Sequence, residues 1–322
     1  MNKKSQHKVR LEWIDVLRAF AILLVVYGHR ANTQFFSAFL NPVKMPLFFA
    51  LSGYLFRFRE GGDMAFFKKT FISLIIPWLF LGLVPLLLSI PIMGFSHAFD
   101  SSIDLFTGKL QWFMPCFILA QILFYYVAKL TKNHLSVMIA CVIVISALGY
   151  FLKQKHILSI FMINLAMMVQ FYFLIGFLYK RYESKLHNVL LRLGALLLLC
   201  YIIIGIIFYP YSAMDVHNAR FLSLPIGTLM TTIGLIALFM LASCIQKYPR
   251  PLISVGKNSL VIYMLDRYAL IPFSKIYQFH APHPIVLTLF MGLIYLVYTS
   301  VVNIFIAKIL NKYIPWATGN RG

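Results

Sequence analysis

Ten long apolar runs take up most of this chain of 322 residues and constrain its fold more than any other feature. A helix needs about 20 mostly apolar residues to cross the hydrocarbon core of a bilayer. Hydrophobic residues make up 61% of the chain and charged residues 12%, against about 25% charged in soluble domains. This balance excludes a soluble enzyme, a disordered protein and a disulfide scaffold. We therefore predict an all-α, polytopic membrane protein with about ten transmembrane helices, at residues 13–29, 41–57, 70–93, 110–128, 135–152, 157–179, 189–209, 222–245, 256–274 and 284–310.

The joining loops are short, so we expect one membrane domain over residues 1–322 with no inserted soluble domain. A cleaved signal peptide has an uninterrupted apolar stretch followed by small residues. Asp15 and Arg18 interrupt the first run, which leads into His29. The first run is therefore predicted to be a retained transmembrane helix.

Topology explains the net charge of +20 better than a nucleic-acid partner does, because the basic residues lie between apolar runs. With the N-terminus inside, more than twice as many Lys and Arg residues fall in inner loops as in outer loops. Cytoplasmic loops carry such an excess. We predict a multi-pass protein of the inner (plasma) membrane, with both termini in the cytoplasm.

All four cysteines lie inside apolar runs and show no CxxC or Cys/His ligand spacing. A buried free cysteine behaves as a small hydrophobic residue. We predict neither a disulfide nor a metal site. The cysteines are Cys116, Cys141, Cys200 and Cys244.

The first run carries three ionisable residues that share one helical face. Asp15 and Arg18 are three residues apart and can touch. Arg18 and His29 are eleven residues apart, which leaves an offset of about 20° around the helix and about 16 Å along it. Arg18 alone is equally well explained as a snorkelling anchor and His29 as an interfacial cap. A polar stripe that crosses most of a bilayer favours a pathway or a site instead.

Other polar residues lie where runs begin or turn, and each has a structural explanation as well as a functional one. Ser52 fits close helix packing, Trp112 an interfacial aromatic belt, and Asn258 a helix cap. Asn41 and Lys44 begin the second run, within reach of His29 across a short loop.

Four blocks, in order along the chain, resemble the integral membrane acyltransferase 3 family. They are Asp15-x-x-Arg18 with the run ending in His29, and the segments 46–54, 112–115 and 256–263. The chain looks most similar to the sugar O-acetyltransferase branch often labelled fucose 4-O-acetylase-like. Two features depart from the family: Asp266 stands where many relatives have His, and no Arg shortly precedes Pro77.

The resemblance implies transfer of an acetyl group from cytoplasmic acetyl-CoA to a hydroxyl of a glycan, such as an exopolysaccharide, an O-antigen or a lipid-linked sugar. His29 would act as base or acyl carrier, with Arg18 beside the donor and Asp15 holding Arg18. The implied partners are a glycan or glycolipid and the lipid bilayer. Candidate donor contacts are Arg18, Ser52, Lys68, Lys69, Trp112, Lys257 and Asn258.

The main alternative is a transporter or flippase of a polysaccharide or lipid, which explains the spans and the polar stripe equally well. Transporters commonly carry repeats with broken helices in matching positions. The prolines of the third run, Pro77, Pro85 and Pro91, have no clear counterpart in the second half of the chain. A non-catalytic scaffold is disfavoured by the cost of burying Arg18 and His29 on one face.

Overall fold

The structure, a computed structural model, describes residues 11–30, 33–58, 62–132, 134–186, 189–279 and 283–319. Some basic residues behind the topology prediction lie outside these ranges, namely Lys3, Lys4, Lys8, Arg10, Arg59 and Arg321. The described part is almost entirely helical, which confirms the predicted all-α class. Its strands are β1 (Met214–Asp215) and β2 (Arg220–Phe221), which form one short antiparallel hairpin.

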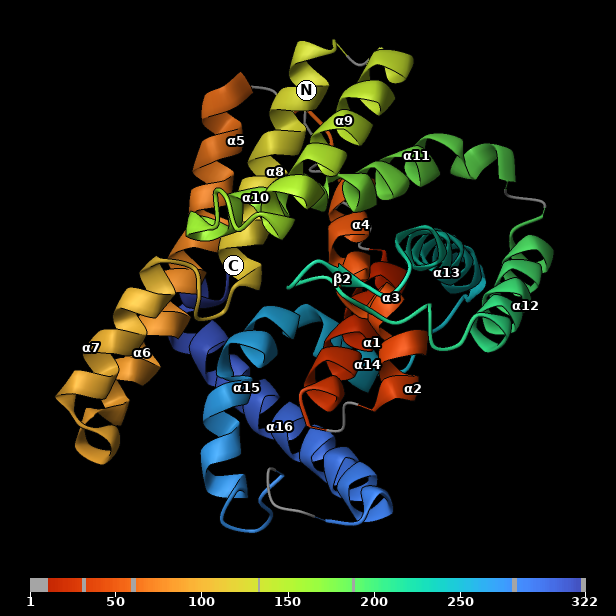
Figure 1. Ribbon diagram of the computed structural model, residues 1–322. Coiled ribbons are helices and arrows are strands. Elements are labelled where there is room, and N and C mark those ends of the chain that lie inside the picture. Colours follow the sequence, from red (N-terminus) through yellow and green to blue (C-terminus); the bar gives the residue numbers. More distant parts are fainter. Residues whose placement is uncertain are drawn as a thin grey trace, which may run out of the picture.

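The helices follow one another along the whole chain (Figure 1). In the first half they are α1 (Glu12–Gly28), α2 (Gln34–Phe39), α3 (Asn41–Lys44), α4 (Pro46–Tyr54), α5 (Gly62–Thr70), the π-helix η1 (Phe71–Ile75), α6 (Ile76–Met93), α7 (Phe95–Phe106), α8 (Phe113–Leu130) and α9 (Leu135–Gln154). In the second half they are the 3₁₀ turn η2 (Ile160–Met162), α10 (Ile163–Met168), α11 (Gln170–Leu186), α12 (Leu190–Ile207), α13 (Leu224–Cys244), α14 (Arg250–Lys257), α15 (Ser259–Phe273), α16 (Ile285–Tyr313) and the 3₁₀ turn η4 (Pro315–Thr318).

Seven helical segments of the described chain are long and apolar enough to cross a membrane, and a bent pair raises the number to eight. The bent pair joins 160–168 to 170–186 at 47°. The expected count of ten is therefore not confirmed. The difference lies in α1 and α15, which have only 17 and 15 residues. These two helices carry Asp15, Arg18 and Asp266, and other helices cover them.

Helix α1 lies at the centre of the molecule and packs against α3, α4, α13, α14, α15 and α16 (Figure 1). Around it, α12 and α13 form one side, α15 and α16 another, and α5, α8 and α9 a third. The helices α9, α12 and α16 expose many large apolar side chains, for example Val144, Ile207 and Val297. Such surfaces are stable against lipid and not against water.

Glycines allow the closest helix crossings. A Cβ on Gly256 would lie 1.7 Å from the carbonyl oxygen of Asp15, so α14 rests directly on the backbone of α1. At the crossing of α4 and α11, a Cβ on Gly53 would lie 1.9 Å from the carbonyl oxygen of Phe173. Small residues permit this approach between membrane helices. The crossings therefore fix the position of the α1 stripe relative to its neighbours.

The third apolar run folds differently from a simple kinked span. The π-helix η1 ends two residues before Pro77, and α6 then continues as a helix through Pro85 and Pro91. Helix α7, which the sequence did not predict, returns along α6 as a hairpin that extends away from the rest of the protein (Figure 1). Gly319, near the C-terminus and with φ +71°, packs against the carbonyl oxygen of Ser73 in η1.

Candidate active site

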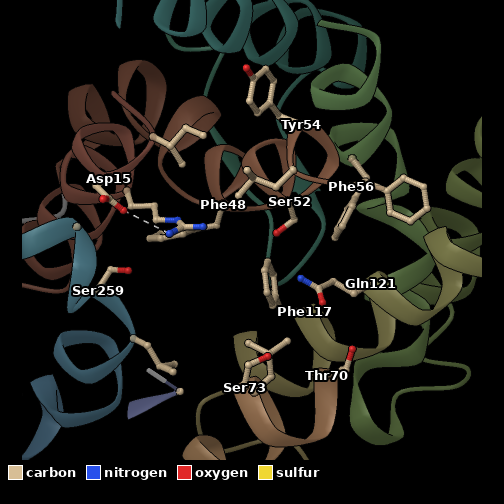
Figure 2. Close-up of a pocket in the computed structure, with 18 of the residues that line it drawn as sticks. Asp15, Phe48, Ser52, Tyr54, Phe56, Thr70, Ser73, Phe117, Gln121 and Ser259 are labelled. Carbon is tan, nitrogen blue, oxygen red and sulfur yellow. Dashed lines mark hydrogen bonds and ion pairs between the residues drawn. The ribbon is translucent and has the colours of Figure 1, made fainter. Parts of the chain in front are cut away.

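A cavity of about 830 Å³ opens between α1, α4, η1, α8, α14 and α15. We call it the Arg18 cavity, after the residue that α1 contributes with Asp15. In Figure 2, the polar side chains of Ser52, Thr70 and Gln121 lie around its centre together with Ser73 and Ser259. The cavity thus brings together segments that are far apart along the chain.

The charge of the Arg18 cavity is strongly positive. Asp15 is 2% exposed, and its Oδ1 pairs with Nη1 of Arg18 at 3.5 Å, as the three-residue spacing predicts (Figure 2). No other acidic residue in the described part lines the cavity. A surface of this kind attracts anionic ligands, phosphates above all. The basic residues of the lining are Arg18, Arg57, Lys69, Lys180 and Lys257.

Aromatic rings also line the Arg18 cavity. The ring of Phe113 lies 5.5 Å from Phe48, 5.1 Å from Phe117 and 5.3 Å from Tyr263, measured between ring centroids. All four rings line the cavity. The lining of the cavity therefore combines basic side chains with a cluster of aromatic rings, which suits a ligand with a charged head and a thin, less polar arm.

The structure separates the predicted donor contacts into two groups. Arg18, Ser52, Lys69 and Lys257 line the Arg18 cavity, as Asp15 does. The other predicted contacts lie elsewhere. Lys68 is exposed on α5, and the side-chain amide of Asn258 donates to the carbonyl oxygen of Ser254 in the manner of a helix cap. Trp112 stacks on His217, with ring centroids 4.6 Å apart and planes at 15°.

His29 does not line the cavity but belongs to a second polar group at the other end of α1. Its Nδ1 lies 3.2 Å from Oδ2 of Asp266 on α15. The same carboxylate oxygen accepts from Nη2 of Arg30 at 3.2 Å. The hydroxyl of Tyr295 on α16 donates to Oδ1 and to the backbone carbonyl of Asp266, both at 2.7 Å. We call these four residues the His29 network.

The His29 network holds a nearly buried carboxylate in a defined orientation. Asp266 is 4% exposed, whereas the side chain of His29 is 46% exposed and accessible to a ligand. A neutral imidazole that donates from Nδ1 to an ionised carboxylate keeps a free lone pair on Nε2. In the His29 network, Nε2 is therefore the ring nitrogen that is not engaged by Asp266.

The sequence did not predict the pairing of His29 with Asp266. The partners are 237 residues apart, and no local pattern connects them. No sequence pattern pointed to Tyr295 as a partner of Asp266, because Tyr295 lies within an apolar run. The side-chain amide of Asn41, which was expected within reach of His29, donates to the carbonyl oxygen of Met214 at 2.8 Å.

The Arg18 cavity and the His29 network are aligned along α1 and separated by buried apolar residues. The cavity reaches along α1 as far as Arg18, and Ile22 and Val25 follow at 0% and 2% exposure. Arg18 and His29 lie eleven residues apart, or about 16 Å along the helix. The distance is that of a ligand arm and not of a direct contact.

Comparison with known proteins assigns this arrangement to one family. The model of the family described as Acyltransferase domain matches residues 11–308. The chain belongs to the acyltransferase family. No curated protein and no solved structure matches it. The family match spans all four sequence blocks and both polar groups, and favours an enzyme over a transporter.

In this membrane acyltransferase, the two groups differ in the chemistry they can perform. Among the described residues that line it, the Arg18 cavity offers cations, aromatic rings and the paired carboxylate of Asp15, and no histidine. The His29 network offers a supported imidazole with an accessible nitrogen. Binding of an anionic donor therefore suits the first group, and proton transfer suits the second.

Proposed function

We propose that this acyltransferase moves an acetyl group from acetyl-CoA to a hydroxyl of a glycan, as in the fucose 4-O-acetylase-like branch. The acceptor is an exopolysaccharide, an O-antigen or a lipid-linked sugar, and the enzyme lies in the inner membrane with both termini in the cytoplasm. The observation that carries the proposal is the alignment of a basic cavity with a supported histidine along one helix.

The donor fits the Arg18 cavity by charge and by shape. The phosphates of the nucleotide would bind the basic residues of the lining, of which Arg57, Lys69 and Lys257 are three. The pantetheine arm is about 15–20 Å long when extended. It would run along the aromatic rings past Phe113, in the direction of the His29 network.

His29 would then act on the acceptor hydroxyl. Its Nε2 accepts the hydroxyl proton while the oxygen attacks the thioester carbonyl carbon. The carbon–sulfur bond breaks, and the imidazolium returns the proton to the leaving thiolate. Asp266 stabilises the imidazolium through Nδ1. In the alternative, Nε2 attacks the thioester carbonyl carbon and the thiolate leaves; the acceptor hydroxyl then displaces the imidazole from the acetyl group, and its proton passes to the thiolate.

Label transfer from [acetyl-¹⁴C]acetyl-CoA in membranes tests the proposal, with host glycans as acceptor. Wild-type protein should produce alkali-labile label in the glycan, and His29→Ala should reduce the rate by about 10²–10⁴. His97→Ala, exposed on α7, is the matched control and should retain activity. Equal labelling by His29→Ala would remove His29 from the mechanism. Absence of label with folded wild-type protein would favour the alternative function, a transporter or flippase.

Two adjacent lysines test the donor side. Lys69 lines the Arg18 cavity and Lys68 does not, although both are exposed and carry the same charge. Lys69→Met should raise the KM for acetyl-CoA by about 10-fold, the size of one charge-assisted hydrogen bond. Lys68→Met should leave it unchanged. An equal effect of both substitutions would indicate a general surface field instead of a defined phosphate contact.

A further inference from the structure

Five residues from four separate segments meet near the β1–β2 hairpin, away from the Arg18 cavity. We call them the hairpin cluster: Lys44, Trp112, Lys153, Asp215 and His217. The rings of Trp112 and His217 are stacked. The carboxylate of Asp215 interacts electrostatically with both lysines and with His217. Both lysines, the two rings and Asp215 are only partly exposed.

The hairpin that carries this cluster is held firmly. The amide of Asn41 donates to the carbonyl oxygen of Met214 at 2.8 Å, and Nε2 of Gln154 donates to that of Ala219 at 2.7 Å. Within the turn, Asn218 donates to Oδ2 of Asp215 at 2.6 Å. The segment with His217 is therefore fixed at both ends, so its side chains form a prepared surface.

The charges of the hairpin cluster are not balanced. The ammonium groups of Lys44 and Lys153 form no hydrogen bond or ion pair with any residue that the structure describes, although the ammonium of Lys44 lies over the ring of Phe36. Two partly buried ammonium groups thus share the single carboxylate of Asp215. A desolvated cation without a partner is costly and favours binding of an anion.

The pKa of His217 is lowered from its ordinary value, first by burial and then by the positive charge of Lys153, while Asp215 opposes the shift. The ring is therefore neutral near pH 7. A neutral imidazole both donates and accepts hydrogen bonds, which suits hydroxyl groups.

The hairpin cluster adjoins the His29 network on two sides. The ammonium of Lys44 lies 3.1 Å from the position that a Cβ on Gly28 would take, immediately before His29. Gln111, next to Trp112, donates to the carbonyl oxygen of Met264, two residues before Asp266. Its Oε1 is buried and has no partner in the described structure. A ligand on the cluster would therefore approach His29 from the end opposite to the donor cavity.

We propose that the hairpin cluster binds the acceptor through an anionic group, a carboxylate or a phosphate, held by Lys44 and Lys153. The sugar ring would lie against Trp112 and His217, with a hydroxyl directed to His29. Aromatic rings and convergent polar groups together form the usual recognition surface for such ligands. This inference rests on the proposed glycan acetyl transfer, and it assigns Trp112 to the acceptor instead of the donor.

Calorimetric titration of the purified full-length protein, without donor, tests the inference. The probes are methyl glucuronide for the carboxylate, glucose 1-phosphate for the phosphate, and methyl glucoside as the neutral control. At least one charged probe should bind about 10-fold or more tightly than the neutral one. Lys153→Met should abolish that preference, and Lys155→Met, an exposed neighbour, should preserve it. Which charged probe binds better identifies a uronate or a phosphate.

Equal binding of charged and neutral probes, binding of none of them, or a preference that survives in Lys153→Met would each overturn the inference. Its failure is distinguishable from failure of the proposed function. Glycan labelling from acetyl-CoA by a protein that shows no charge preference would leave the function intact. Charge-selective binding by a folded protein that labels no glycan would support the hairpin cluster as an anion site and contradict the proposed acetyl transfer.

Discussion

Replacement of Asp266 by Asn tests the support of His29 most directly. The carboxylate accepts from Nδ1 of His29 and from Nη2 of Arg30, each at 3.2 Å, and from the hydroxyl of Tyr295 at 2.7 Å. Asn keeps the volume and one acceptor oxygen, but its NH₂ group can only donate. If the NH₂ faces His29, the proton moves to Nε2, and the nitrogen that should act as base is blocked.

We expect kcat of Asp266→Asn to fall by about 10²–10⁴, the range for loss of a general base. The KM for acetyl-CoA should change little, because Asp266 does not line the Arg18 cavity. The stability cost should be moderate, because in this orientation the amide oxygen still accepts from the hydroxyl of Tyr295. Asp266→Ala is different: it leaves the largely buried Arg30 without its ion pair, at a cost of about 3–5 kcal/mol.

The assay is the initial rate of acetyl transfer, with kcat and KM for acetyl-CoA determined separately, on protein of unchanged size-exclusion profile. Asp266→Glu keeps the charge and should recover part of the rate. Asp100→Asn, exposed on α7, is the matched control. A near wild-type kcat for Asp266→Asn, or a loss confined to the KM for acetyl-CoA, would refute the positioning role.

Three further predictions concern the cavity, the fold and pH. Arg18→Met should raise the KM for acetyl-CoA at least about 10-fold in initial-rate measurements. Gly256→Ala forces α14 away from Asp15 and should lower the Tm strongly, whereas Gly227→Ala, where a Cβ meets nothing closer than 3.2 Å, should not. The lowered pKa of His217 means that the folded state resists its protonation. Its contribution to stability is complete above about pH 6.5 and is lost as the pH falls through the lowered pKa, so His217→Gln should flatten the Tm profile there.

The prediction of the helical membrane class depended on local information, and it is confirmed. Long apolar runs leave a chain few alternatives, because a bilayer requires every backbone group to be paired within a helix or a closed barrel. The predicted number of ten transmembrane helices is not confirmed. Helices α1 and α15 are short and carry ionisable residues, and protein covers them where longer spans meet lipid. Apolar length alone did not distinguish a lipid-facing span from a buried helix.

Local spacing also determined the pair within α1. Three residues along a helix bring two side chains together, and Asp15 and Arg18 pair at 3.5 Å. The same rule does not say which of two adjacent lysines faces a cavity. Lys69 lines the Arg18 cavity and Lys68 does not, because the rotation of α5 and η1 depends on their packing against the neighbouring helices.

The sequence by itself determined the membrane class, the polar stripe of α1 and the resemblance to an acyltransferase, because helical period and apolar length are local properties. Only the tertiary structure decided that Asp266 and Tyr295 support His29, and that Trp112 lies against His217 instead of in the Arg18 cavity. These contacts join residues of different helices. They exist because close crossings such as Gly256 on Asp15 set the position of each helix, and no period along the chain encodes such a crossing.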